Sequence, residues 1–174
     1  TTFRTEGTYA DNRHPDKVNI VTDIRQDLSR RDFTVNAMAY SPKRGLIDPF
    51  GGVEDLKNRC LRCVGDPETR FREDALRILR GVRFSVTYGL IPEGKTEQAM
   101  EALAPLLDHL ARERVFSEFC GFLPKITAEE LARFAPIITQ VIPELRETVC
   151  FDQHSPHHKY DLYTHIAHVV EGVP

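Results

Sequence analysis

The 174-residue chain lacks two features that define broad classes of protein. It has no apolar run near the roughly 18 residues of a membrane-spanning helix, and no segment of it resembles a signal peptide. It also lacks an excess of basic residues, because 23 Lys and Arg stand against 26 Asp and Glu, a net charge of −3. These absences predict no membrane partner, and they argue against a general nucleic-acid binder, whose binding surface would be basic.

Cysteine is scarce, and its spacing does not predict a zinc finger. The Cys-x-x-Cys spacing of Cys60 and Cys63 is not followed by a second such pair, or by a His pair at a finger-like interval. With Cys120 and Cys150, we expect four reduced and mostly buried thiols. Reduced thiols are typical of the cytoplasm, where we expect this protein to be found.

The sequence does not begin with methionine. Its first residues, Thr1 to Arg4, resemble the middle of a strand, and its last residues continue a helical pattern that has not visibly finished. We therefore expect a fragment of a longer protein. The length suits one domain or two small ones, and a hydrophobic content of 41% is enough for a packed core. The sequence does not predict an oligomeric state.

Basic charge is nevertheless concentrated in one segment. Between residues 59 and 83, seven Arg stand against four acidic residues, so this segment carries a local charge of +3. We expect an anionic partner to bind there.

The same segment contains a regular polar pattern, in which Asp74, Arg77, Arg80 and Arg83 follow one another at three-residue steps. Apolar residues lie between them, so a helix over residues 69–88 would carry a polar stripe on one side and a buried apolar face on the other. Arginine suits phosphate and base edges, and a carboxylate can accept from an exocyclic amino group. The pattern predicts a nucleotide-binding helix. A solvated face with ion pairs between neighbouring turns is the alternative.

Strand and turn signals dominate the first third of the chain. Polar turn formers over residues 8–16 predict a long loop, and a strand over residues 18–21 should follow. Ser41 to Gly45 predicts a hairpin turn, and Gly51 and Gly52 should permit positive φ in a tight turn.

Helical signals dominate the rest. Thr96 is a candidate cap for one helix, and the Thr127-Ala-Glu-Glu130 segment predicts a capping box at the start of another. The expected helices cover residues 69–88, 95–107, 111–123, a segment beginning at Thr127, and 158–170.

A second polar cluster lies in the segment from Asp27 to Tyr40. It groups Arg30, Arg31, Asp32 and Asn36 beside an apolar stretch. The cluster predicts either a solvated helix start, with Asp32 near the positive end of the dipole, or a phosphate clamp.

Five motifs in order now identify a family. Arg30-Arg-Asp-Phe-Thr-Val-Asn-Ala37, Asp48-Pro-Phe-Gly-Gly-Val-Glu-Asp55 and Glu73-Asp-Ala-Leu-Arg77 closely resemble the class II tRNA nucleotidyltransferases, the CCA-adding enzymes, with bacterial poly(A) polymerases as close relatives. Phe3 to Asp11 resembles the flexible loop of that family, and Arg112 to Glu118 is similar to its later neck motif.

The resemblance implies an α+β fold in three parts. A partial nucleotidyltransferase head of the polymerase-β type, with a flexible loop and a short mixed sheet, would cover residues 1–57. A helical, nucleotide-selecting neck would cover residues 58–123, with the Asp48-to-Gly52 segment as the hinge between head and neck. The start of a helical body, or HD-like domain, would cover residues 124–174.

The resemblance also implies site residues and partners. Arg31 would contact the incoming nucleotide, and Asp74 and Arg77 would pair with the edge of CTP or ATP, so that the protein acts as template for CCA addition to tRNA. Arg80 and Arg83 would contact phosphate and sugar. The supporting residues are Arg30, Asp32, Asn36, Glu73 and Glu118, the last of which would steady the helix that carries the stripe.

One motif of the family is missing. Its catalytic Asp-x-Asp pair, which holds two Mg²⁺ ions, is expected before Thr1, and residues Asp23 to Asp27 have the wrong spacing. We therefore expect the full-length protein to be a Mg²⁺-dependent enzyme and this fragment alone to be inactive.

A histidine-rich segment near the end of the chain allows two interpretations. Tyr163 to Val169 resembles the opening helix of an HD-type metal phosphohydrolase, in which His165 would match the first metal ligand. Alternatively, these His residues lie on the surface or cap a body helix.

Three other functions remain open from the sequence. An A-adding enzyme or poly(A) polymerase would carry the same motifs. An HD-type phosphohydrolase could use the front half as an RNA-binding module. A non-catalytic RNA-binding module is the third of these alternatives, and the local charge of only +3 favours it least.

Overall fold

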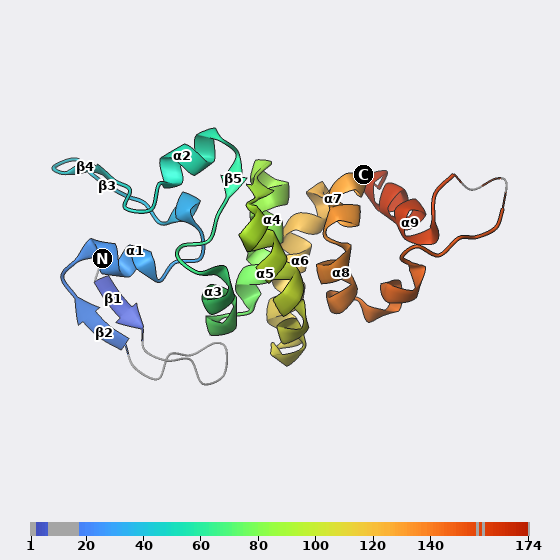
Figure 1. Ribbon diagram of the computed structural model, residues 1–174, viewed down its shortest axis with the longest axis horizontal. Helices are drawn as coiled ribbons and strands as arrows, with labels where there is room; N and C mark the ends of the chain where they lie inside the picture. Colours follow the sequence, from blue (N-terminus) through green and yellow to red (C-terminus); the bar gives the residue numbers. More distant parts are fainter. Residues whose placement is uncertain (1–2, 7–17, 156, 158, 174) are drawn as a thin grey trace.

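A computed structural model describes residues 3–6, 18–155, 157 and 159–173. The molecule is elongated, with the first four strands at one end, the longer helices in the middle and the last helices at the other end (Figure 1). The α-helices are α1 Ile24–Ser29, α2 Gly52–Lys57, α3 Pro67–Glu73, α4 Leu76–Tyr88, α5 Gly94–Leu103, α6 Arg112–Phe122, α7 Ala128–Arg133, α8 Ala135–Val141 and α9 Leu162–Glu171. Short 3₁₀ helices are η1 Thr34–Asn36, η2 Ala104–His109, η3 Leu123–Lys125 and η4 Pro143–Thr148.

The described strands form three separate pairs rather than one short mixed sheet. Strands β1 Phe3–Glu6 and β2 Val18–Val21 are antiparallel, as are β3 Ala39–Ser41 and β4 Gly45–Ile47, whereas β5 Cys60–Leu61 and β6 Ile91–Pro92 are parallel. The α+β class, the strand over residues 18–21 and the hairpin are confirmed. The whole of the predicted loop over residues 8–16, and most of the flexible-loop motif, lie outside the described residues.

The prediction of one helix over residues 69–88 is wrong, because the chain leaves helical geometry at Asp74. This residue has φ −145° and ψ 102°, and its Oδ1 accepts a hydrogen bond from the backbone N–H of Leu76, 3.1 Å away. Aspartate competes for nearby backbone donors in this way and so favours helix ends. Asp74 therefore lies between α3 and α4 and is not part of a continuous stripe.

Other helix boundaries differ at their caps. Glu93, not Thr96, caps α5, because the Glu93 side chain accepts from the N–H of Thr96. The capping box at Thr127 is confirmed. The last helix begins later than predicted, since Asp161 caps α9 and accepts from the N–H of Thr164.

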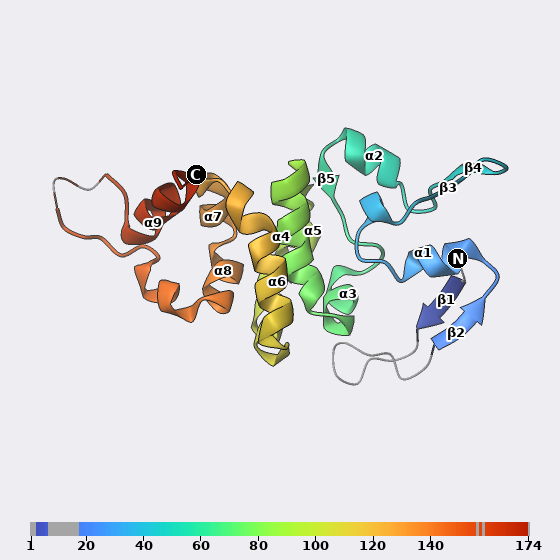
Figure 2. The same cartoon turned by 180° about the vertical axis from the view of Figure 1, so that it is seen from behind.

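The core is built around α4, whose buried face includes Ile78, Leu79 and Val82. Helices α4 and α6 pack against each other, and α3 packs against α5, near the middle of the molecule (Figures 1 and 2). Phe33, which precedes η1, is fully buried in the same cluster and so connects the front segment to the helical core. No helix of the described residues is long and apolar enough to cross a membrane.

The turn before α2 needs two glycines for different reasons. Gly51 has φ +77° in the left-handed region, as predicted, but Gly52 has no positive φ. A Cβ atom on Gly52 would lie 2.2 Å from the backbone oxygen of Thr34. The Asp48 carboxylate accepts from the N–H groups of Gly52 and Val53 at 2.8 and 2.9 Å, which closes the turn.

The prediction of mostly buried thiols is wrong. All four cysteines are free, but Cys120 and Cys150 are exposed and Cys60 is half-buried. Only Cys63 is buried, and burial, followed by the nearby Asp32 charge, raises the pKa of its thiol to about 12. Cys63 therefore stays protonated at neutral pH.

Candidate functional site

The two polar clusters predicted from the sequence meet in one open groove of about 350 Å³, which we call the arginine groove. It lies where the segment after α1 faces α4 and α6. Five guanidiniums and two carboxylates surround it, which gives a local charge of +3. The lining residues are Arg30, Arg31, Asp32, Asn36, Asp74, Leu76, Arg77, Arg80 and Arg114.

Asp32 is the structural centre of the segment after α1. Its side chain is buried, and its Oδ1 accepts from the N–H of Phe33 at 3.0 Å and from Nδ2 of Asn36 at 2.7 Å. Its Oδ2 accepts from Nε of Arg80 at 2.6 Å. Asp32 is therefore occupied by positioning bonds, and it fixes Arg80 of α4 against the front segment.

Arg80 is half-buried and permanently charged. Burial works against its charged form, but the carboxylates of Asp32, Glu118 and Asp74 together outweigh that effect, so the pKa of Arg80 lies above its usual value. Only Nε is used by Asp32 in the described contacts. The terminal nitrogens of the guanidinium therefore remain available to an anion in the groove.

Arg77 is largely committed to the protein. Its Nη1 donates to the backbone oxygen of Arg70 at 3.1 Å and to Glu73 Oε2 at 2.7 Å, and its Nη2 donates to the backbone oxygen of Arg30 at 3.0 Å. These contacts use three of the five N–H donors of a guanidinium. Two donors remain, and Glu73 acts by holding Arg77 in place.

Asp74 faces the groove from the break between α3 and α4. One oxygen accepts from the N–H of Leu76, and the other lies 3.5 Å from Nη2 of Arg114, which projects from α6. A carboxylate offers about four acceptor positions, so Asp74 keeps capacity for a ligand.

Arg114 is a groove residue that we did not predict from the sequence. It lies four residues before Glu118, so both side chains lie on one side of α6, and that spacing could have indicated it. Its Nη1 is buried and has no hydrogen-bond partner among the described residues. The same is true of Oδ1 of Asn36. The groove thus presents one unmet donor and one unmet acceptor.

Arg31 and Arg83 have different positions. Arg31 lines the groove with a half-exposed side chain, and its Nη1 donates to the backbone oxygen of Asn36 at 3.1 Å. Arg83 does not line the groove, so the predicted stripe does not converge on one site. Its Nε instead lies 2.9 Å from Oε2 of Glu118, an ion pair that joins α4 to α6.

No metal site is formed by the residues that the structure describes, since no three His, Cys, Asp or Glu side chains are grouped to hold an ion. His165 lies on the exposed side of α9. The Asp-x-Asp motif that implies the magnesium ligands does not occur among these residues.

Two family models match the chain. Residues 1–62 match the "Poly A polymerase head domain", and residues 89–147 match the "Probable RNA and SrmB-binding site of polymerase A". The chain is 53% identical over 119 residues to the CCA-adding enzyme of Streptococcus gordonii, which covers 68% of this chain and 30% of that protein. It is 44% identical over 151 residues to the CCA-adding enzyme of Enterococcus faecalis, with 84% and 37% covered.

Solved structures give the same relationship. The Bacillus stearothermophilus CCA-adding enzyme in complex with CTP has a TM-score of 0.68 and 42% identity, over 78% of this chain and 32% of that one. The Thermotoga maritima CCA-adding enzyme complexed with tRNA has a TM-score of 0.63 and 33% identity, with 70% and 31% covered. The chain thus spans about a third of the length of the relatives it matches.

Proposed function

Because the chain belongs to the family of CCA-adding enzymes and poly(A) polymerases, we propose that it is the nucleotide-selecting part of a tRNA nucleotidyltransferase. The whole enzyme adds CCA to the 3′ end of tRNA from CTP and ATP, with Mg²⁺ bound by an Asp-x-Asp pair outside this sequence, and acts in the cytoplasm. The observation that carries the proposal is the arginine groove, which gathers Arg31, Asp74, Arg77 and Arg80 from distant parts of the chain.

The groove is suited to reading a base. An exocyclic amino group donates to the free acceptor capacity of Asp74, and a ring acceptor receives a bond from a remaining donor of Arg77. On their Watson–Crick edges, cytosine and adenine both place an amino group beside a ring nitrogen that accepts. Uracil and guanine present a ring N–H donor at that ring position, which leaves the Arg77 donor without a partner.

The groove is also suited to a polyphosphate. Arg31 and the terminal nitrogens of Arg80 offer charge-assisted donors, and the net positive charge of the lining favours an anion. Arg83 supports the site indirectly, by tying α4 to α6 through Glu118.

Each of the three parts proposed for the chain supplies different residues to these functions. The head over residues 1–57 supplies Arg31 and Asp32, and the neck over residues 58–123 supplies Asp74 and the arginines of α4. Residues 124–174 form the start of a helical body, in which His165 is a candidate first ligand of an HD-type metal site.

A calorimetric titration of the 174-residue chain tests nucleotide choice without requiring catalysis. We expect CTP and ATP to bind more tightly than UTP and GTP, and Asp74→Asn to remove that difference. Equal binding of all four nucleotides by the unchanged chain would refute the proposal.

A poly(A) polymerase is the second candidate, because the match over residues 1–62 is to a poly(A) polymerase head domain. The two functions differ in their use of CTP. A longer chain that carries the Asp-x-Asp pair should incorporate two C residues and one A into a tRNA that lacks CCA, whereas a poly(A) polymerase would incorporate A alone.

A further inference from the structure

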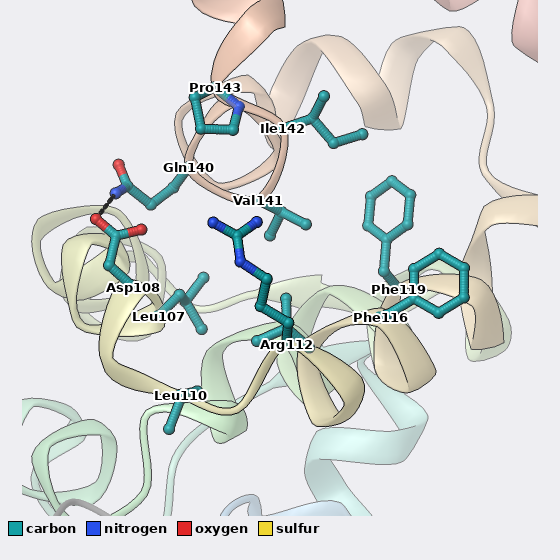
Figure 3. A pocket seen from close by; sticks show the side chains of 11 residues that line it. Leu107, Asp108, Leu110, Arg112, Phe116, Phe119, Gln140, Val141, Ile142 and Pro143 are labelled. Carbon is teal, nitrogen blue, oxygen red and sulfur yellow. Dashed lines mark hydrogen bonds between the residues drawn. The ribbon is translucent and has the colours of Figure 1, made fainter.

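A second cavity, of about 320 Å³, lies between α6 and the segment joining α8 to η4 (Figure 3). It shares no lining residue with the arginine groove. Its floor includes the buried side chains of Leu107, Leu110 and Phe119. The volume is at the lower end of the range of roughly 300–1,000 Å³ that is typical of small-molecule sites. We call this cavity the Arg112 pocket.

One aromatic ring and one guanidinium stand over this apolar floor. Phe116 is 67% exposed although it lies beside the pocket, and Arg112 is one helical turn before it on α6. Figure 3 shows the guanidinium of Arg112 directed into the space below Gln140 and Val141. Arg112 makes no ion pair or hydrogen bond with the described residues. Exposed aromatic rings and arginine planes are the surfaces on which unpaired bases stack.

The opposite wall holds a fixed acceptor. Nε2 of Gln140 donates to Oδ2 of Asp108 at 2.5 Å, and Nη2 of Arg146 donates to Oε1 of Gln140 at 3.2 Å. These two linked hydrogen bonds orient the Asp108 carboxylate, which can still accept a hydrogen bond from a ligand in the pocket. A ligand that carries both a donor and an acceptor around an apolar ring would match Asp108, Arg112 and the floor together.

We propose that the Arg112 pocket binds a single unpaired nucleobase of an RNA. A nucleobase has two apolar faces and an edge of donors and acceptors, whereas an apolar side chain of a protein partner would leave Arg112 and Asp108 unmatched. All lining residues fall within residues 89–147, the segment that matches an RNA-binding family model. The proposal rests on the proposed function only for the choice of RNA as the ligand.

The site has a characteristic electrostatic property. One Arg and one Asp are the only charged residues of its lining, so its net charge is zero. Binding there depends on stacking and edge contacts rather than on phosphate neutralisation, and it should therefore change little with salt concentration. Binding in the arginine groove, which carries a charge of +3, should weaken steeply as salt is added.

The test titrates the 174-residue chain with single-stranded hexacytidylate and with an RNA duplex of the same length, at two salt concentrations. To lower binding in the arginine groove, the titrations use Arg31→Ala as the background, because Arg31 lines that groove and its loss removes one positive charge. We expect hexacytidylate, and not the duplex, to bind with a shallow salt dependence and to shift the NMR ring signals of Phe116. Phe116→Leu and Arg112→Ala should each weaken binding roughly tenfold.

Ser117→Ala is the matched control, because Ser117 is exposed on α6 and lines neither cavity. It should bind hexacytidylate as the background does. Unchanged affinity in both pocket variants, a steep salt dependence, or equal binding of the duplex would overturn the proposal. CTP choice that does not depend on Asp74 would instead refute the proposed function and leave this result standing.

Discussion

At the scale of single residues, Asp74 and Arg77 have different roles although they belong to one motif. The Asp74 side chain makes one hydrogen bond to the backbone and faces the groove, whereas Arg77 is only 8% exposed and its side chain bonds to three other residues. Arg77 therefore supports the fold and the proposed base contact together. Substitution of Asp74 separates these two effects better than substitution of Arg77.

The first prediction concerns this difference. Asp74→Asn should cost roughly 1–3 kcal/mol of discrimination between CTP and UTP, because an acceptor becomes a donor, and should leave the melting temperature nearly unchanged. Arg77→Ala should lose discrimination and also destabilise the chain by roughly 1.5–3 kcal/mol, since it removes charged hydrogen bonds. Calorimetry and thermal unfolding measure the two effects. Equal loss of stability in both variants would contradict the assignment.

The second prediction concerns Gly52. A Cβ atom there would lie 2.2 Å from the backbone oxygen of Thr34, and a backbone atom cannot move aside as a side chain does. Gly52→Ala should therefore destabilise the chain by about 1–3 kcal/mol. Gly94→Ala is the control, because a Cβ at Gly94 meets nothing within 4 Å. Urea unfolding of both variants checks the prediction, and similar midpoints would contradict it.

At the scale of elements, the break between α3 and α4 shows where sequence periodicity stops being informative. The three-residue spacing from Asp74 to Arg83 predicts one helix, and the arginines from position 77 onwards do lie on α4. The spacing could not indicate that the Asp74 side chain bonds to the N–H of Leu76 and ends helical geometry there. Nor could it indicate that Arg83 pairs with Glu118, since that contact depends on how α6 packs.

The third prediction belongs to α9 and its cap. Hydrogen bonds from the side chain and backbone of Thr164 lower the pKa of Asp161 below its usual value. Because the folded pKa is the lower one, the cap stabilises α9 fully above the unfolded pKa and loses that effect as pH falls through the folded value. The protection factors of the α9 amides, which compare the observed exchange rate with the intrinsic rate at the same pH, should therefore fall below about pH 4.

Asp161→Asn provides the control for this experiment. Asparagine is also a good cap but does not titrate, so the variant should keep α9 formed and lose the acid dependence. An identical acid dependence in the variant would mean that other groups, not Asp161, control the end of the helix.

At the scale of the whole molecule, α6 connects the two cavities. Arg114 reaches Asp74 in the arginine groove, whereas Arg112 and Phe116 of the same helix line the other pocket. The resemblance in the sequence grouped Arg31, Asp74, Arg77 and Arg80, and in the structure these four residues line one groove. The second pocket could not be predicted, because its wall is formed by residues from two segments about 30 positions apart, which only packing brings together.

The last prediction concerns catalysis by these 174 residues. The sequence contains no Asp-x-Asp pair, and the described residues form no group of three metal-binding side chains. When the chain is incubated with CTP, Mg²⁺ and a tRNA that lacks its CCA end, a denaturing gel should therefore show no extension of the tRNA. Calorimetry should nevertheless detect CTP binding. A longer chain that supplies the Asp-x-Asp pair is the positive control. Incorporation of even one C by residues 1–174 would mean that carboxylates within this chain hold the ions, and the role assigned to the arginine groove would have to include catalysis.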